Sequence, residues 1–252
     1  MISFLPMYDR PELYPANDML WSVVRATLGY GPERLDRTIE LWDGWQHPDL
    51  VLGQTCNLPY RMSLKGKVQI VGHPDFALPR CPRGYYNSVL VARQTDPRSL
   101  EELLHCRVVY NQDHSHSGCL ALWDHAQTLG IEPNFIAESG AHVASAAMIS
   151  NGEADLAAID AHSWRLIRRY DAHSAGLREI TRTIPTPAPP FICSAHHDVD
   201  GVRAALRKAI DSLPQVQRAT LNLHGLIELP QDLMLNMPTP PQVPAMPISA
   251  TA

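Results

Sequence analysis

The sequence predicts an α/β protein whose strands are separated by amphipathic helices. Short apolar runs alternate with longer amphipathic ones over the first 85 residues and again from Ser88 onward, a pattern typical of βαβ units. The proline-rich run Pro185–Pro190 then breaks regular structure, and a strand and a long amphipathic helix follow it. The 252 residues suit one large domain or two modest lobes.

The first part of this pattern predicts one helix between strands. Four positions at helical spacing are expected to share one face: Leu20, Val24, Thr27 and Leu28. Asn17 is expected to cap the start of this helix, and Gly29 to end it. The strands are expected at Ile2–Met7, Leu50–Gly53 and Val68–Gly72.

The rest of the chain predicts three more helices. The first runs from about Ser117 to Leu129, with the buried stripe Leu122, Trp123, Ala126 and Leu129. The others are expected at Ala141–Ser150 and, with the clearest apolar periodicity of the chain, at Val202–Leu213. The strands are expected at Ser88–Ala92, Arg107–Asn111, Phe135–Glu138, Leu156–Asp160 and Phe191–Ser194.

Composition narrows the classes of partner. Hydrophobic residues at 45% and a formal net charge of −5 suit a globular protein and argue against a nucleic-acid partner. No run approaches the roughly 20 apolar residues of a transmembrane helix.

The five cysteines form no C-x-x-C pair and are expected to be buried as small apolar residues. The first residues lack the features of a signal peptide, which is expected for a cytoplasmic protein or a mature exported one.

In this order the elements resemble the phosphate, phosphite and phosphonate substrate-binding proteins of ABC importers, which share the type II periplasmic-binding-protein fold. The segments that carry the resemblance over residues 1–200 are Leu5-Pro6-Met7-Tyr8, Trp21, Gly53-Gln54-Thr55-Cys56, Tyr85-Tyr86-Asn87-Ser88, Asn111, Ser115-His116-Ser117-Gly118, Gly140-Ala141-His142 and the run from Gly152 to Asp160.

The resemblance implies two α/β lobes, each a mixed, mainly parallel sheet flanked by helices, which close on a small ligand. Lobe one is expected at 1–85 plus 187–252, lobe two at 88–182, and a proline-rich tail at 230–252. Two crossing segments, near 84–90 and 180–190, would join the lobes and act as hinges. The resemblance also implies a small phosphorus-containing anion as ligand, an ABC permease as partner and a periplasmic location, with no catalysis and no cofactor.

The best candidate for anion contact is the segment Ser115, His116, Ser117 and Gly118. It precedes a helix, so unpaired amide groups and the positive end of the helix dipole would face an anion there. The alternative is that Ser117 only caps the helix. His116 stands where the family usually carries a smaller polar residue.

Four further candidates come from the expected lobe one and the first crossing. Gln54 and Thr55 follow a strand at its carboxyl end, where open α/β sheets bind ligands, although the residues alone favour an ordinary strand-to-helix loop. Tyr86 could donate its phenol to a ligand oxygen or cover an organic group. The resemblance adds Tyr8.

His142 and Asp160 complete the set of candidates. His142 as imidazolium could pair with an anion, and Asp160 could receive a ligand amine or instead cap the helix before Trp164. Several histidines are close in sequence, but their spacing matches no closed zinc pattern, so no metal is expected. These histidines are His114, His116, His142 and His162.

Two other functions remain open on the same residues. A cytosolic enzyme resembling the chorismate dehydratase of menaquinone biosynthesis would use His142 and Asp160 as acid and base on a carboxylate. No nucleophile elbow, P-loop or dinucleotide fingerprint supports catalysis. A regulatory module that has lost its ligand would explain why Asn57, His116 and Cys119 depart from the family pattern.

Overall fold

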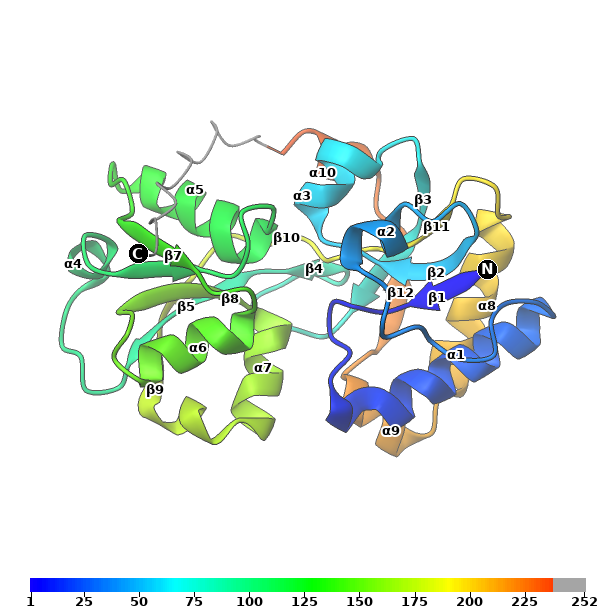
Figure 1. Ribbon diagram of the computed structural model, residues 1–252, viewed down its shortest axis with the longest axis horizontal. Helices are drawn as coiled ribbons and strands as arrows, with labels where there is room; N and C mark the ends of the chain where they lie inside the picture. The colour runs from blue at the N-terminus through cyan, green and yellow to red at the C-terminus, as the bar shows by residue number, and fades with distance from the viewer. Residues whose placement is uncertain (238–252) are drawn as a thin grey trace, which may run out of the picture. The chain divides into compact units, whose positions relative to one another are not determined.

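The computed structural model describes residues 1–237, which divide into two compact units. We call residues 1–86 with 186–236 lobe one, and residues 87–185 lobe two (Figure 1). Both contain a mixed sheet with helices on its two faces, which confirms the α/β class and the mixed sheets expected from the sequence. Of the expected tail, residues 232–235 form a short helix, and residues 238–252 lie outside the described part.

The sheet of lobe one has five strands in the order β1-β2-β11-β3-β12. β1 pairs parallel with β2, whereas β11 runs antiparallel between β2 and β3, and β12 pairs antiparallel with β3. β11 is the strand that returns after the proline-rich run, which brings the late chain back into the middle of the sheet. The strands are β1 Ile2–Phe4, β2 Leu50–Gln54, β3 Val68–Asp75, β11 Phe191–Ser194 and β12 Gly225–Ile227.

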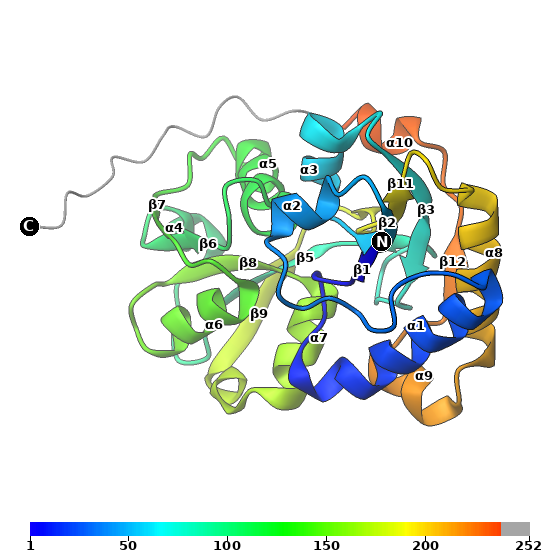
Figure 2. The ribbon, with the colours of Figure 1, turned by 45° about the vertical axis from the view of Figure 1, so that its right-hand side comes forward.

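Helices cover both faces of this sheet. On one face α1 packs beside α8, as Figure 1 shows, and α9 lies next to α1 (Figure 2). On the other face an apolar cluster around Phe4, Trp45 and Ile192 is closed by the short helices and by Met234 of α10. The helices are α1 Tyr14–Leu28, α2 Leu41–Trp45, α3 Asn57–Pro59, α8 Val199–Ser212, α9 Gln215–Leu221 and α10 Asp232–Leu235.

Two expectations about α1 are wrong. Asn17 does not cap this helix, because α1 begins at Tyr14, after a 3-10 turn at Pro11–Leu13, and Asn17 within it donates to Asp9. Pro15 in the first turn suits that earlier start. Thr27 is exposed, whereas the end at Gly29 is confirmed by its left-handed backbone (φ 76°).

The sheet of lobe two has the order β7-β6-β8-β5-β9. β6 pairs parallel with β7 and β8, and β5 runs antiparallel between β8 and β9. The carboxyl ends of β6, β7 and β8 therefore lie at one edge, together with the start of β5. The strands are β5 Ser88–Arg93, β6 Val108–Tyr110, β7 Phe135–Glu138, β8 Leu156–Asp160 and β9 Leu177–Arg182.

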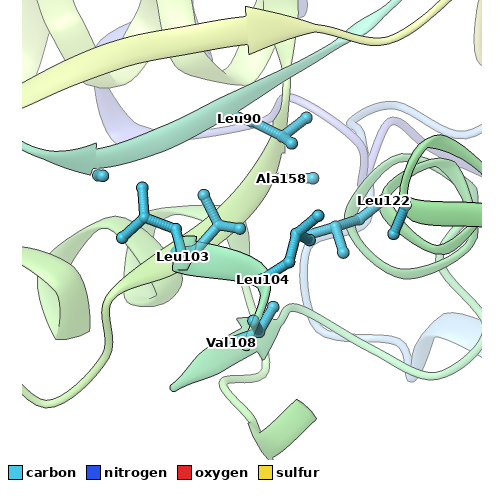
Figure 3. Packing of buried hydrophobic residues seen from close by; sticks show 9 residues of the cluster. Leu90, Leu103, Leu104, Val108, Leu122 and Ala158 are labelled. Atoms are coloured by element: carbon cyan, nitrogen blue, oxygen red, sulfur yellow. The ribbon is translucent and has the colours of Figure 1, made fainter. Parts of the chain in front are cut away.

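The core of lobe two lies on both faces of its sheet. Because side chains alternate along a strand, Leu90 points to the face covered by α4 and α5, where it joins Leu104, Leu122 and Ala158 (Figure 3). On the other face α6 and α7 pack on β5 and β8. This two-sided burial explains why the strands read as continuous apolar runs. The helices are α4 Leu100–Leu104, α5 Ala121–Thr128, α6 His142–Ser150 and α7 Ala161–Tyr170.

The helix expected from Ser117 to Leu129 differs from the structure. It starts as a π-helical turn at His116–Leu120 and continues as α5. Trp123 is only half-buried, and Leu129 lies past the end of α5 with 40% of its surface exposed, so both leave the expected stripe. The wider π turn rotates the following residues relative to an α-helix, which the apolar spacing alone does not reveal.

The chain passes between the units twice. Just before lobe two, β4 (Tyr85–Tyr86) pairs antiparallel with β10 (Thr186–Pro187), which follows lobe two. None of the five cysteines, all within the described residues, forms a disulfide; Cys56, Cys119 and Cys193 are buried as expected, whereas the other two are partly exposed. Within residues 1–237 no helix is long and apolar enough to cross a membrane.

Candidate functional site

Polar side chains gather at the edge of the lobe two sheet where β6, β7 and β8 end. Asn111 follows β6, and Ser139 and Gly140 follow β7. Two backbone bonds join these ends, from Ser139 N to Tyr110 O and from Gly140 N to Asn111 O, each 2.8 Å. The left-handed backbone of Gly140 (φ 85°) lets the chain turn there into α6, so that His142 begins this helix beside Asn111.

The segment Ser115–Gly118 lies against the same residues. Ser115 is the N-cap of the π turn, since its Oγ accepts from the Gly118 amide at 3.1 Å. Ser117 therefore does not cap the helix, and the cap alternative is wrong for this residue. Instead its Oγ lies 2.9 Å from Nε2 of His142 and 3.5 Å from Oγ of Ser115.

Gly118 makes room for this arrangement. A Cβ on Gly118 would overlap the side-chain oxygen of Asn111, lie 2.8 Å from its Cγ and come within 3.1 Å of Cε1 of His142. The missing side chain therefore lets the Asn111 carboxamide and the imidazole pack directly on the backbone of the segment. Gly118 is needed here for close approach, as its φ is not positive.

The side-chain oxygen of Asn111, Oδ1, is buried without a hydrogen-bond partner among the described residues. Asn111 is 8% exposed, and its Oδ1 lies shielded from solvent against Gly118. Buried amides almost always have partners, so such a group points to an absent ligand or water. Asn111 contributed to the sequence resemblance but was not among the predicted site residues; its position at the end of a predicted strand was the available signal.

His142 is neutral at pH 7, because burial lowers its pKa to about 4. Its side chain is half-buried overall, but Nδ1 is shielded from solvent and has no partner in the described part of the chain. An unpaired N–H costs more than an unpaired lone pair, which assigns the ring proton to Nε2. Nε2–H then donates to Ser117 Oγ, which leaves the Ser117 hydroxyl proton for Ser115 Oγ or for a ligand oxygen. His142 is therefore not the imidazolium expected from the sequence at pH 7.

Asp160 caps α7. Its Oδ1 accepts from the amides of His162 (2.7 Å) and Ser163 (2.8 Å), and the residue is 2% exposed. Arg165 lies close enough that the Asp160 charge opposes the lowering of its pKa caused by burial and Arg169. His116 is buried beside Ser117 in the π turn. Within residues 1–237 no three His, Cys, Asp or Glu side chains are grouped as a metal site would require.

The remaining candidates belong to lobe one. The Gln54 carboxamide donates to Pro189 O at 3.0 Å, and the Thr55 hydroxyl bonds to the neighbouring Cys56 carbonyl at 3.4 Å. Both residues are buried, as is Tyr86. Tyr8 packs edge-on against Phe76, with ring centroids 5.1 Å apart. These three contacts lie within lobe one, and a contact of any of the four residues with a ligand stays a prediction.

The donors of lobe two suit a small anion. Ser117, Asn111 and the first-turn amides of the helix all belong to one cluster, and uncharged donors at a helix start bind anions well. Two α/β lobes with such a cluster at the carboxyl edge of one sheet are typical of two-lobed solute-binding proteins.

The family model of the "ABC transporter, phosphonate, periplasmic substrate-binding protein" matches residues 71–228. The chain belongs to this family, and the family match favours transport over the enzyme alternative. No curated protein sequence matches the chain.

Solved structures share the fold at low sequence identity. PhnD1 of Prochlorococcus marinus, in complex with methylphosphonate, has a TM-score of 0.75 and 16% identity, over 93% of this chain and 94% of that one. A binding protein component of the ABC phosphonate transporter of Pseudomonas aeruginosa has a TM-score of 0.69 and 16% identity, over 93% and 83%. A Xanthomonas citri protein bound to chloride has a TM-score of 0.66 and 15% identity, over 92% of both chains. These likenesses confirm the type II periplasmic-binding-protein fold.

Proposed function

We propose that the chain is a non-catalytic receptor that binds a phosphonate-class anion through Ser117, Asn111 and the helix start at His116. The observation that carries the proposal is the 2.9 Å pair of Ser117 Oγ and the neutral His142, beside the side chain of Asn111, whose buried Oδ1 has no partner among the described residues. His142 orients the Ser117 hydroxyl outward, and Asn111 adds amide donors. Family membership and the methylphosphonate held by the Prochlorococcus protein support phosphorus oxyanions as the ligand class.

Calorimetric titration of the purified chain at pH 7 tests this ligand class. The probes are methylphosphonate, phosphite and phosphate, with sulfate as a comparison anion. Ser117→Ala removes one hydrogen bond to a charged ligand, worth about 1.5–3 kcal/mol, so the Kd should rise roughly tenfold to a hundredfold. Ser212→Ala is the matched control, because this hydroxyl donates to Ala209 O within α8 of lobe one.

Two results would overturn the proposal. Binding of no phosphorus anion excludes the ligand class, and an unchanged Kd in Ser117→Ala excludes this site. Phosphorus NMR of the bound anion over hours tests the absence of catalysis, since the signal of an untransformed ligand stays at its initial shift.

Delivery to an ABC permease from the periplasmic side is the second part of the proposal, and family membership supports it. Deletion of the gene should abolish growth on methylphosphonate as the sole phosphorus source and leave growth on phosphate unchanged. Fractionation of the cells measures where the protein resides. Unchanged growth of the deletion strain contradicts a role in uptake.

A further inference from the structure

The peptide bond between Ser117 and Gly118 is held from both sides by serine hydroxyls. Ser88 Oγ donates to Ser117 O at 2.8 Å, and the Gly118 amide donates to Ser115 Oγ at 3.1 Å. The carbonyl and N–H of a trans peptide point in opposite directions, so the two bonds fix the rotation of one peptide plane. That plane lies in the segment Ser115–Gly118, the proposed anion-binding segment.

Ser88 is itself fixed through both of its backbone groups. Its amide donates to Thr183 Oγ1 and its carbonyl accepts from the Thr183 amide, each at 2.9 Å. Ser88 is 1% exposed and pairs with Asp160 across the β5–β8 ladder. All three of its polar groups are therefore engaged, so that its hydroxyl has a single orientation.

The position of Ser88 along the chain adds to this role. It is the second residue of lobe two after the connection from lobe one, and Thr183 lies two residues before the last residue of lobe two, Pro185. Within lobe two, the same hydrogen bonds thus join the incoming connection, the outgoing connection and the anion-binding segment.

We propose that Ser88 is a positioning residue that sets the Ser117–Gly118 peptide for anion binding without contacting the ligand. This inference rests on the proposed function of the segment. Without the Ser88 hydroxyl, the Ser117 carbonyl lacks its donor, the peptide plane can rotate, and the donors of the segment lose their alignment. A ligand must then order the segment on binding, which reduces affinity.

The test compares Ser88→Ala with Ser194→Ala, a buried serine of β11 in lobe one that is 2% exposed. Titration with methylphosphonate should show a Kd about tenfold higher for Ser88→Ala, as one lost hydrogen bond predicts, and an unchanged Kd for Ser194→Ala. The second readout is hydrogen exchange of the Gly118 amide in the absence of ligand, measured by NMR. This exchange should be faster in Ser88→Ala and unaltered in Ser194→Ala.

Thr183→Val provides a second variant, because it removes the acceptor of the Ser88 amide at nearly constant volume. This variant should also raise the Kd for methylphosphonate. If Ser88→Ala does not fold, Thr183→Val is used in its place. If the wild type binds methylphosphonate and both variants bind within twofold of it, the role of Ser88 is refuted while the proposed function stands. Weaker binding with unchanged Gly118 exchange refutes positioning as well. If the wild type binds no phosphorus anion, the proposed function itself fails and the inference with it.

Discussion

Nε2 of His142 lies 2.9 Å from Oγ of Ser117, and burial keeps this imidazole neutral, with its pKa lowered to about 4. A neutral ring cannot attract an anion by its charge. Its contribution is to orient a hydroxyl, and anion binding at the proposed site would therefore depend on the geometry of hydrogen-bond donors.

The lowered pKa of His142 makes stability depend on pH in one direction. The folded protein takes a proton on this ring only near pH 4, whereas the unfolded chain does so near its ordinary value of 6.5. The unfolded state thus binds more protons between these values, and stability falls as the pH falls from 6.5 to 4. Between pH 7.5 and 5.5, His142→Gln should lose about 1 kcal/mol less stability than the wild type in urea unfolding. His105→Gln, at an exposed position, is the control variant.

Gly118→Ala should disrupt the site by steric overlap. The new Cβ would meet the Asn111 carboxamide and lie 3.1 Å from Cε1 of His142, so we expect a stability loss of about 1–3 kcal/mol and loss of phosphonate binding. Gly176→Ala is the control in lobe two, since its Cβ would meet only Ser150 Oγ, at 4.0 Å. Adding Asn111→Ala should restore part of the stability lost in Gly118→Ala. Additive losses in the double variant contradict this account.

Asp155 joins several elements of lobe two through arginines. Burial alone would raise the pKa of its carboxyl, but bonds from Arg107, Arg93 and Arg98 outweigh burial and lower it. The side chain is 5% exposed and accepts from Arg98 at 2.8 Å and from Arg107 at 2.9 Å. Asp155→Asn should therefore cost roughly 3 kcal/mol or more in urea unfolding at pH 7. Asp211→Asn, at an exposed position of α8, is the control and should cost little stability. A changed Kd for methylphosphonate in Asp155→Asn would show that the cluster of Asp155 and its arginines also affects the proposed anion site.

The same cluster predicts acid sensitivity. A hydrogen bond from Arg98 lowers the pKa of Asp96 to about 2, and the pKa of Asp155 is lowered too. Both carboxylates stabilise the fold above the pKa of the unfolded chain, near 4, and this contribution is lost as the pH falls below that value. The thermal midpoint of the wild type should drop between pH 4 and 2. Asp155→Asn should show a shallower drop; an equal slope in both proteins contradicts the assignment.

Asp160 is expected to act as a helix cap without selecting a ligand amine. Its Oδ1 is engaged by two amides of α7, and the nearby Arg165 offsets its charge. Titration should therefore give 2-aminoethylphosphonate no tighter binding than methylphosphonate. Asp160→Ala should cost about 1 kcal/mol of stability, and Asp160→Asn less, since asparagine also caps helices. A preference for the amine that disappears in Asp160→Asn would reverse this assignment.

Periodicity predicted the elements best where a lobe buries a face continuously. Three strands begin and end at the residues predicted from the sequence: Phe135–Glu138, Leu156–Asp160 and Phe191–Ser194. Two of the errors concern helix starts: Asn17 lies inside α1, and the helix after Ser115 opens with a π turn. The residue at which a helix starts depends on the hydrogen-bond partners of its first turn, and these partners are set only in the folded chain. One residue pattern therefore permits several starts.

The sequence by itself determined the α/β class, most strands, the family resemblance and the segment Ser115–Gly118, since each depends on local spacing of residue types. Only the tertiary structure decided the roles inside that segment: Ser115 caps the helix, Ser117 pairs with His142, and Ser88 holds the peptide between Ser117 and Gly118. The paired groups are 25 and 29 residues apart along the chain. Hydrogen bonds between such distant residues form because β5 and the ends of β6, β7 and β8 meet at one edge of a sheet, which local spacing does not encode.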